Sequence, residues 1–134
     1  MIVLDSSFLV AYHNTRDTHH AAAARGMAHL VAGTWGRALL PEYVFLEIVT
    51  VLRSRRGRDV ATQAGNVLLD ARDVDFVPCS DLFLAAWGVL QSEPAGQLSL
   101  TDAAVVALAR REKPGFVATF DEDFRGVGGV EVVP

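Results

Sequence analysis

The sequence predicts a three-layer α/β sandwich, in which a mostly parallel five-stranded sheet is covered by helices on both faces. Two observations lead to this prediction. Short apolar runs of strand length alternate along the chain with longer stretches that are typical of helices. These runs also lack the polar alternation of a half-exposed strand, as expected when both faces of a sheet are covered. With 134 residues, 51% of them hydrophobic, and no internal repeat, the chain is expected to form one domain over residues 1–134.

The elements follow from apolar runs and from the glycines and prolines between them. The expected strands are Ile2–Leu4, Ala38–Leu40, Val74–Val77, Phe116–Phe120 and Val130–Val133. The expected helices are His19–Leu30, Glu42–Arg53, Val60–Asp70, Leu82–Gln91 and Asp102–Arg111. The expected turns are Gly33–Gly36, Gly57, Pro94–Gly96 and Gly126–Gly129.

The composition argues against several classes of protein. No apolar run is long enough to span a bilayer, so no membrane association is expected. The chain starts with a strand and has no basic segment before it, which argues against a cleaved signal peptide. Cys79 is the only cysteine, so no internal disulfide can form. We expect a buried, inert thiol in a protein of the reducing cytoplasm.

Basic residues are clustered, although the net charge of -4, from 12 Lys and Arg against 16 Asp and Glu, gives no general attraction to nucleic acid. One basic run surrounds Gly57 and consists of Arg53, Arg55, Arg56 and Arg58. A second run consists of Arg110, Arg111 and Lys113. Either run is explained by solvated residues at the end of a helix, where the dipole favours positive charge. The first run could instead hold a nucleic-acid backbone, a contact that positions a substrate without reading its sequence.

Four acidic residues interrupt or end apolar elements: Asp5, Glu47, Asp102 and Asp121. An acid in such a place is costly unless it is solvated, hydrogen-bonded or bound to a cation. Asp5 and Asp121 follow the first and fourth strands, and parallel sheets bind ligands beyond the carboxyl ends of their strands. Four acids that converge on one pocket would form an oxygen-ligand site for a hard ion such as Mg²⁺.

Two of these acids also have a purely structural explanation. Glu47 shares a polar stripe with Tyr43 and Thr50 at helical spacing, and such a stripe usually faces water. Asp102 falls in the first turn of a helix, where an acid interacts favourably with the dipole. Thr101 could be the N-cap of that helix. Position alone leaves both explanations open.

Four segments form a longer pattern over essentially the whole chain: Met1–Ser7, Pro41–Glu47, Leu98–Ala103 and Val117–Phe124. Each is a weak signal alone, but their order and spacing are specific. Together they resemble the PIN domain, and more narrowly the VapC-type toxin ribonucleases of bacterial toxin–antitoxin pairs. The resemblance implies the parallel α/β sandwich and cleavage of RNA that depends on Mg²⁺ or Mn²⁺. It further implies a homodimer that is silenced by a cognate antitoxin protein.

The resemblance also implies roles for individual residues. The catalytic and metal-binding acids would be Asp5, Glu47, Asp102 and Asp121, with Asp123 as a further ligand or a supporting acid. The supporting hydroxyl groups would be Ser6, Thr101 and Thr119. The Arg-rich turn is a departure from the family pattern, and from their charge alone the candidates for contact with the RNA backbone are Arg53, Arg55, Arg56 and Arg58. A divalent ion would lower the pKa of a bound water and screen the charge at the phosphate.

Two other functions remain open from the residues alone. The apolar helix Glu42–Leu52 and the many alanines would also suit a non-catalytic interaction module. The alternation of strands and helices would also suit phosphotransfer to Asp5, as in receiver domains. That chemistry needs a lysine after the last strand, whereas Lys113 precedes the fourth.

Overall fold

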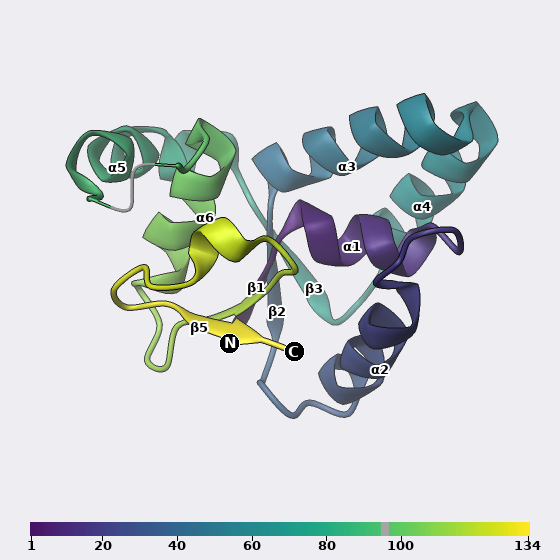
Figure 1. Ribbon diagram of the computed structural model, residues 1–134, viewed down its shortest axis with the longest axis horizontal. Helices are drawn as coiled ribbons and strands as arrows, with labels where there is room; N and C mark the ends of the chain where they lie inside the picture. The colour runs from purple at the N-terminus through teal and green to yellow at the C-terminus, as the bar shows by residue number, and fades with distance from the viewer. Residues whose placement is uncertain (95–96) are drawn as a thin grey trace.

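The strands form one sheet in the order β3-β2-β1-β4-β5, and each neighbouring pair is parallel (Figure 1). This computed structural model describes residues 1–94 and 97–134. The strands are β1 (Ile2–Leu4), β2 (Ala38–Pro41), β3 (Val74–Val77), β4 (Phe116–Ala118) and β5 (Glu131–Val133). The prediction of a mostly parallel five-stranded sheet is confirmed.

Helices cover both faces of the sheet, as predicted (Figure 1). One side carries α1 (Ser6–His13), α2 (His20–Val31), α3 (Glu42–Arg56) and α4 (Arg58–Asp70). The other side carries α5 (Cys79–Ser92) and α6 (Leu100–Ala109), and a short 3₁₀ helix η1 (Glu122–Phe124) follows β4. The strand order advances from β1 to β3 and then returns to β4 on the other side of β1. Because such crossovers are right-handed, this reversal moves the later helices to the opposite face.

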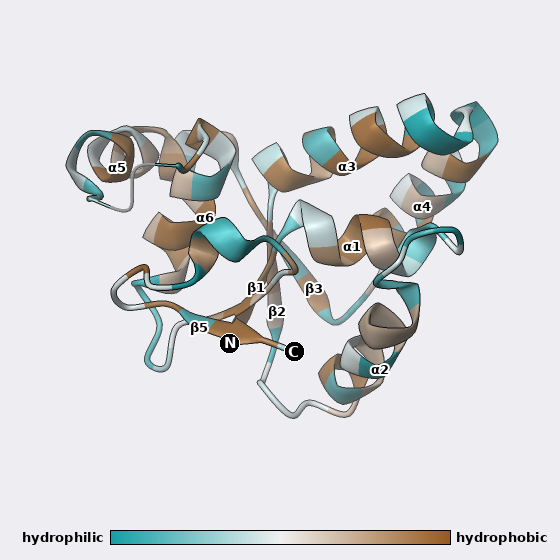
Figure 2. Ribbon diagram, viewed as in Figure 1, coloured by the Kyte–Doolittle hydropathy of each residue, from teal (hydrophilic) through white to brown (hydrophobic). Residues whose placement is uncertain are grey.

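The core lies between the sheet and its two helical layers. All three residues of β1 are at most 1% exposed, and α6 is buried continuously from Ala103 to Ala109. Alanine and valine along α6 let its backbone approach the sheet closely, which gives the dense packing typical of protein interiors. Figure 2 shows the same distribution, with hydrophobic segments in the central strands and in α6.

Three boundaries differ from the sequence prediction in an informative way. Helix α1 was not predicted, and β4 ends at Ala118, not at Phe120. Helix α6 begins at Leu100 and ends at Ala109, two residues earlier at each end than Asp102–Arg111. The remaining elements agree within a few residues. The predicted turn Pro94–Gly96 lies partly outside the described residues.

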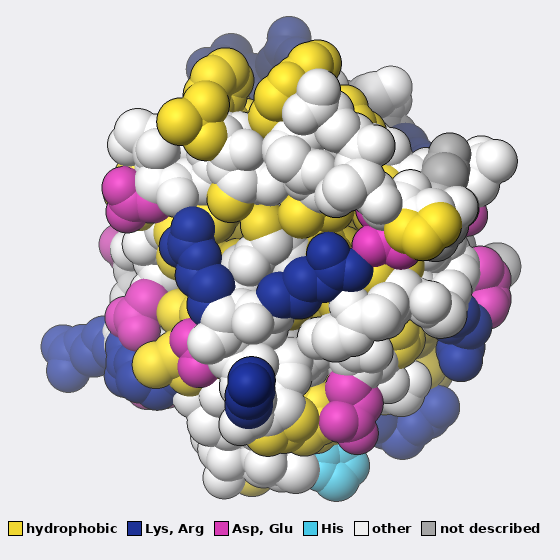
Figure 3. All heavy atoms as spheres, turned by 90° about the vertical axis from the view of Figure 1, so that its left-hand side faces the viewer, with side chains coloured by type: hydrophobic (Ala, Val, Ile, Leu, Met, Phe, Trp, Pro, Cys, Tyr) yellow, Lys and Arg dark blue, Asp and Glu magenta, His cyan; other side chains and the backbone are white. Residues whose placement is uncertain are grey.

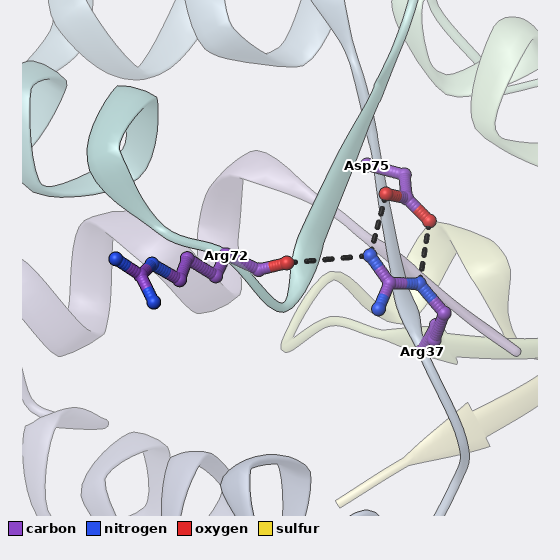
Figure 4. Close-up of polar contacts among 3 residues, drawn as sticks. All are labelled: Arg37, Arg72 and Asp75. Atoms are coloured by element: carbon purple, nitrogen blue, oxygen red, sulfur yellow. Dashed lines mark hydrogen bonds and ion pairs between the residues drawn. The ribbon is translucent and has the colours of Figure 1, made fainter.

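An ion pair links the beginning of β2 to β3 (Figure 4). Arg37 Nε and Nη2 donate to Asp75 Oδ2 and Oδ1 at 2.7 and 2.6 Å, and Nη2 also donates to the Arg72 carbonyl at 3.3 Å. The hydrogen bond from Arg37 lowers the pKa of Asp75. Both side chains are largely solvent-exposed, so the pair contributes little to stability and mainly orients the strand ends.

Two expectations about the class of protein can be compared with the structure. No helix within residues 1–94 and 97–134 is both long and apolar enough to cross a membrane.

Cys79 is partly exposed at the start of α5, so the prediction of a buried thiol is wrong. Its backbone N–H donates to Glu42 Oε1 at 2.8 Å. Desolvation and the nearby Glu42 charge raise the pKa of the Cys79 thiol, which disfavours the reactive thiolate.

Candidate active site

The carboxyl ends of β1 and β4 meet at the point where the strand order reverses. Leu4 pairs with Ala118, so Asp5 and Thr119 leave the sheet side by side. The Asp5 backbone N–H extends this pairing by donating to the Ala118 carbonyl at 3.1 Å. This is the position at which open parallel sheets bind ligands.

Asp5 is the most tightly held acid of the site. It is 2% exposed and is the N-cap of α1. Its Oδ2 accepts hydrogen bonds from Ser7 Oγ at 2.8 Å, from Thr119 Oγ1 at 2.7 Å and, less closely, from Ser7 N at 3.4 Å. Its Oδ1 is buried and has no hydrogen-bond partner among the described residues. One oxygen therefore orients the carboxylate, and the other is left for a ligand.

The same two hydroxyl groups fix the loop that follows β4. Phe120 N donates to Ser7 Oγ at 2.9 Å, and Asp121 N donates to Thr119 Oγ1 at 3.0 Å. Asp121 then caps η1, because its Oδ1 accepts from Asp123 N at 2.9 Å. The loop is thus held against Asp5 before any ligand binds.

Glu47 reaches the site from α3. Its Oε2 is buried and, like Asp5 Oδ1, has no hydrogen-bond partner within residues 1–94 and 97–134. An unpaired buried carboxylate oxygen is costly, so it marks a place for a proton, a water or a cation. Glu47 is partly buried, so the interpretation of a solvated stripe does not describe it.

Asp102 has the structural role that the sequence allowed, at the beginning of α6. It forms a capping box with Ser99: Ser99 N donates to Asp102 Oδ2 at 2.9 Å, and Asp102 N donates to Ser99 Oγ at 3.1 Å. Ser99 is thus the N-cap of α6, and the prediction of Thr101 at that position is wrong. The Asp102 carboxylate also lies near enough to Asp5 and Asp121 to interact with their charges.

The environment favours the protonated forms of two of these acids. Desolvation by burial raises the pKa of Asp5 above its ordinary value, and the hydrogen bonds from Thr119 and Ser7 oppose that rise. Burial also raises the pKa of Asp102, and the negative charges of Asp5 and Asp121 add to it. A cation placed among these carboxylates would offset both causes, because it favours the charged forms.

A cavity of about 340 Å³ opens between α1, α3 and the loop after β4. Its wall includes Ser6, Glu47 and Asp121, together with Arg55 from the end of α3. Figure 1 shows these elements converging above the sheet. A larger depression of about 800 Å³ runs along α4 from Arg58 to Ala71 and contains none of the four acids.

The predicted arginines separate into different environments. Arg55 is exposed and lines the cavity. Arg56 instead donates through Nη1 to Oδ1 of the buried Asn14 at 2.7 Å, so it supports the fold. Arg53 and Arg58 are exposed and are not part of the cavity wall.

Asp123 is exposed and is not part of the cavity wall either; its backbone N–H supports Asp121.

The structure adds residues that sequence reasoning missed. The Ser7 hydroxyl group, not that of Ser6, bonds the Asp5 carboxylate, although Ser6 lines the cavity. The available signal was an Asp at the junction of a strand and a helix, because an N-cap carboxylate bonds groups two or three residues ahead. Asp17, His19 and Phe120 also line the cavity, and no local pattern pointed to them.

The carboxylates do not form a closed ligand cage. In the part of the chain that the structure describes, no group of three or more His, Cys, Asp or Glu side chains is arranged to hold a metal ion directly. Mg²⁺ commonly keeps several waters and needs only one or two direct carboxylate ligands. The unpaired Asp5 Oδ1 and Glu47 Oε2, with Asp102 near enough to interact with the charges of Asp5 and Asp121, suit such a partly hydrated ion.

Comparisons with known proteins agree with this geometry. The family model of the PIN domain matches residues 2–130. The structure of Mycobacterium tuberculosis VapC20, a toxin that cleaves the sarcin–ricin loop, matches with 30% identity and a TM-score of 0.84 over 100% of both chains. The comparison with curated proteins found no match.

More distant solved structures share the fold. One is VapBC2 from Rickettsia felis bound to promoter DNA, with 13% identity and a TM-score of 0.71 over 99% of this chain and 98% of that one. Another is a toxin–antitoxin complex from Klebsiella pneumoniae, with 16% identity and a TM-score of 0.66 over 98% and 96% of the two chains. The chain therefore belongs to the PIN domain family and, within it, is of the VapC toxin type.

Proposed function

We propose that this protein is an endoribonuclease that hydrolyses RNA phosphodiester bonds with Mg²⁺ or Mn²⁺ and acts as the toxin of a VapBC-type pair in the cytoplasm. One observation carries the proposal. Asp5 is buried at the strand-order reversal with Oδ1 unpaired, and the charge of Asp102 lies close enough to interact with it. A buried carboxylate oxygen without a protein partner needs a proton, a water or a cation, and a divalent ion would serve Asp5 and Asp102 together.

The proposed ligands are Asp5, Asp102 and Asp121, directly or through water, with Glu47 beside them. A bound divalent ion would supply an activated water and would screen the charge of the phosphate. Asp5 Oδ1 is oriented for this contact because Ser7 and Thr119 hold the other oxygen of the carboxylate. We assign supporting roles to two further residues. Asp123 donates its backbone N–H to Asp121, and Thr101 lies in the first turn of α6 beside Asp102.

We assign to Glu47 the orientation of the attacking water. Its Oε2 is a buried acceptor without a partner in the described residues, and the residue lines the same cavity as Asp121. A carboxylate oxygen that has no protein donor is free to accept a hydrogen bond from a water and so to hold that water in position. On the same wall, Arg55 can bind a backbone phosphate and offset the local negative charge.

We propose RNA with an exposed loop as the substrate class to test first. VapC20, at 30% identity over the full length, cleaves such a loop. Sequence-specific recognition of RNA favours loops and single strands, since their bases are accessible.

A cognate antitoxin and a second copy of the chain are the proposed protein partners. Helix α5 exposes Phe83, Leu84, Trp87 and Leu90, which share one side of the helix at spacings of three, four and seven residues. Figure 3 looks onto the α5 side of the molecule and shows hydrophobic side chains gathered along its upper edge. We assign this surface to the contact between the two copies of a homodimer. Analytical sedimentation tests the assignment, because Leu84→Glu should make the protein monomeric. A Leu84→Glu protein that still sediments as a dimer would remove the assignment.

The phosphotransfer alternative has less support. Lys113 precedes β4, whereas Asp5 follows β1, and the two strands are parallel neighbours. The lysine therefore lies at the end of the sheet away from Asp5. A non-catalytic module is not favoured by any further observation.

The test is to sequence the RNA ends produced by the purified protein with Mg²⁺, with Mn²⁺ and with EDTA. We expect defined cleavage sites that disappear with EDTA. Asp5→Asn and Asp102→Asn should lower the cleavage rate by at least about 100-fold. Both variants should fold, because asparagine is also a good capping residue. Retained metal-dependent cleavage in either variant would refute the assignment.

A further inference from the structure

Three aromatic rings form a continuous stack beside the candidate active site. Phe8 contacts Phe120 with ring centroids 6.1 Å apart and 28° between the ring planes. Phe120 stacks on His19 at 4.6 Å, with the planes only 5° apart. Phe8 is fully buried, Phe120 is partly buried and His19 is exposed, so the stack runs from the core to the solvent.

The backbone that carries Phe120 and His19 is held by hydrogen bonds. Phe120 N donates to Ser7 Oγ at 2.9 Å. His19 N donates to Asp17 Oδ1 at 2.8 Å, and Ala23 N donates to the His19 carbonyl at 2.8 Å. Because these rings are ordered in advance, a flat ligand that stacks on them would lose less binding free energy to side-chain ordering.

Two rings of the stack, His19 and Phe120, belong to the wall of the cavity, which includes two of the four candidate acids. His19 and Phe120 line it together with Glu47, Asp121 and Arg55. Phe120 directly precedes Asp121, so the ring and the candidate ligand share a short, hydrogen-bonded loop. One face of the His19 ring lies on Phe120, which leaves the other face for a ligand.

We propose that His19 and Phe120 form a stacking platform for one unpaired nucleobase next to the cleaved bond. This inference rests on the proposed ribonuclease function and adds to it the side chains that would bind one unstacked base of the RNA beside the cleaved bond. Bases splayed out of single strands and loops stack on aromatic side chains, histidine included. Stacking also supplies affinity that does not depend on charge, which matters in a cavity that contains Asp17, Glu47 and Asp121.

The binding test uses a short RNA that spans the cleavage site found by sequencing RNA ends, with 2-aminopurine beside the cleaved bond. Asp5→Asn protein is used so that the RNA stays intact. Stacking on His19 should quench the fluorescence. Adding His19→Ala should abolish the quenching and raise Kd by about 5- to 100-fold. His19→Tyr and His19→Trp should restore both, because they keep a flat ring.

His29→Ala is the matched control. His29 is also exposed and contacts an aromatic ring, that of Trp35 at 5.9 Å, but it lies near the other end of α2. It should leave Kd and quenching at the values of the Asp5→Asn protein.

A cleavage test separates stacking from a structural role. In the otherwise native protein, His19→Ala should raise KM for the normal RNA. It should not change kcat/KM for an RNA that is abasic at the same position, since the ring then has nothing to stack on. Equal losses on both RNAs would assign His19 a structural role and overturn the proposal.

Two further outcomes would also overturn it. Quenching that survives His19→Ala would show that the base stacks elsewhere. A His19→Ala protein that binds RNA normally but escapes inhibition by the antitoxin would assign the rings to the protein partner. Failure of the proposed function has a different signature, because the native protein would then cleave no RNA with Mg²⁺ or Mn²⁺.

Discussion

Thr119 Oγ1 donates a hydrogen bond of 2.7 Å to Asp5 Oδ2, and this bond joins residues that lie 114 positions apart in the sequence. Both residues are 2% exposed. The same Thr119 oxygen accepts from Asp121 N at 3.0 Å. A single hydroxyl group therefore fixes the acid that follows β1 and the loop that carries the acid after β4.

Replacing Thr119 with valine removes that hydroxyl group while keeping the shape of the side chain. We expect the free energy of unfolding to fall by about 1–3 kcal/mol, because the Asp121 N–H loses its acceptor and Asp5 loses a donor. Cleavage should slow as the Asp5 carboxylate loses its orientation. Urea denaturation and single-turnover cleavage measure the two effects. Thr119→Ser keeps the hydroxyl group and should remain close to the native protein. Native stability and activity in Thr119→Val would contradict this role.

Ser7 and Ser6 provide a comparison of neighbouring hydroxyl groups. Ser7 Oγ donates to Asp5 Oδ2 at 2.8 Å and accepts from Phe120 N, whereas Ser6 only lines the cavity. Ser7→Ala should cost about 1–2 kcal/mol of stability and should reduce cleavage. Ser6→Ala should leave the free energy of unfolding within about 0.5 kcal/mol of the native value. The same denaturation series measures both, and a larger effect at Ser6 would reverse the assignment.

Much of the fold could be predicted, because buried parallel strands have a simple sequence pattern. Helix α1 could not. Its residues Phe8–Ala11 are consecutive and all buried, so the helix has no polar face and no periodicity that would separate it from the strand before it. The end of β4 was missed for a different reason. Thr119 is as suited to a strand as its neighbours, and it leaves the sheet to bond the distant Asp5.

The acidic residues of the candidate site could be predicted from the sequence, but the residues that bond or surround them could not. Asp5 and Asp121 end apolar runs, which is visible locally, and the parallel order brings those ends together. Which serine bonds Asp5, and which arginine faces the cavity, depends on the turn of α1 and on the packing of Asn14. Arg55 and Arg56 are adjacent in sequence, yet only Arg56 is bonded to Asn14.

Stability without a divalent ion should depend on pH through Asp102. Its pKa in the folded state is raised above the ordinary value of 3.8, so between those two pKa values the folded state binds more protons than the unfolded state. The stability contributed by this group is therefore present at low pH and is lost as pH rises through the raised pKa. We expect Asp102→Asn to have a higher Tm than the native protein near pH 7 in EDTA, and the difference should shrink toward pH 4.

Asp123→Asn is the control for that series, because Asp123 is an exposed acid near the same site. Its Tm should follow the native curve at each pH. The quantity to compare is the Tm of the native protein minus the Tm of Asp102→Asn, both in EDTA. If this difference rose steadily from pH 4 to pH 8, it would contradict a raised pKa of Asp102.

Arg55 and Arg56 should differ in what they contribute. Arg55→Ala should weaken RNA binding and reduce the slope of log K against log salt concentration by about 0.7, the loss of one contact to single-stranded phosphate. Arg56→Ala should keep that slope and lower the free energy of unfolding by about 1 kcal/mol, because Asn14 loses its bond. Fluorescence anisotropy at several salt concentrations measures the RNA affinity and its salt dependence, and urea denaturation measures the free energy of unfolding. Equal slopes in the two variants would remove Arg55 from the RNA contact.

The most direct measurement is a calorimetric titration of Mn²⁺ into the native protein, Asp5→Asn and Asp102→Asn, with RNA cleavage followed in the same preparations. Shared coordination by carboxylates from α3, α6 and the ends of β1 and β4 predicts saturable binding to the native protein. It also predicts that each variant loses both binding and cleavage while keeping a cooperative thermal unfolding transition. Unchanged Mn²⁺ affinity in both variants, or cleavage that persists in EDTA, would show that these acids do not gather around an ion.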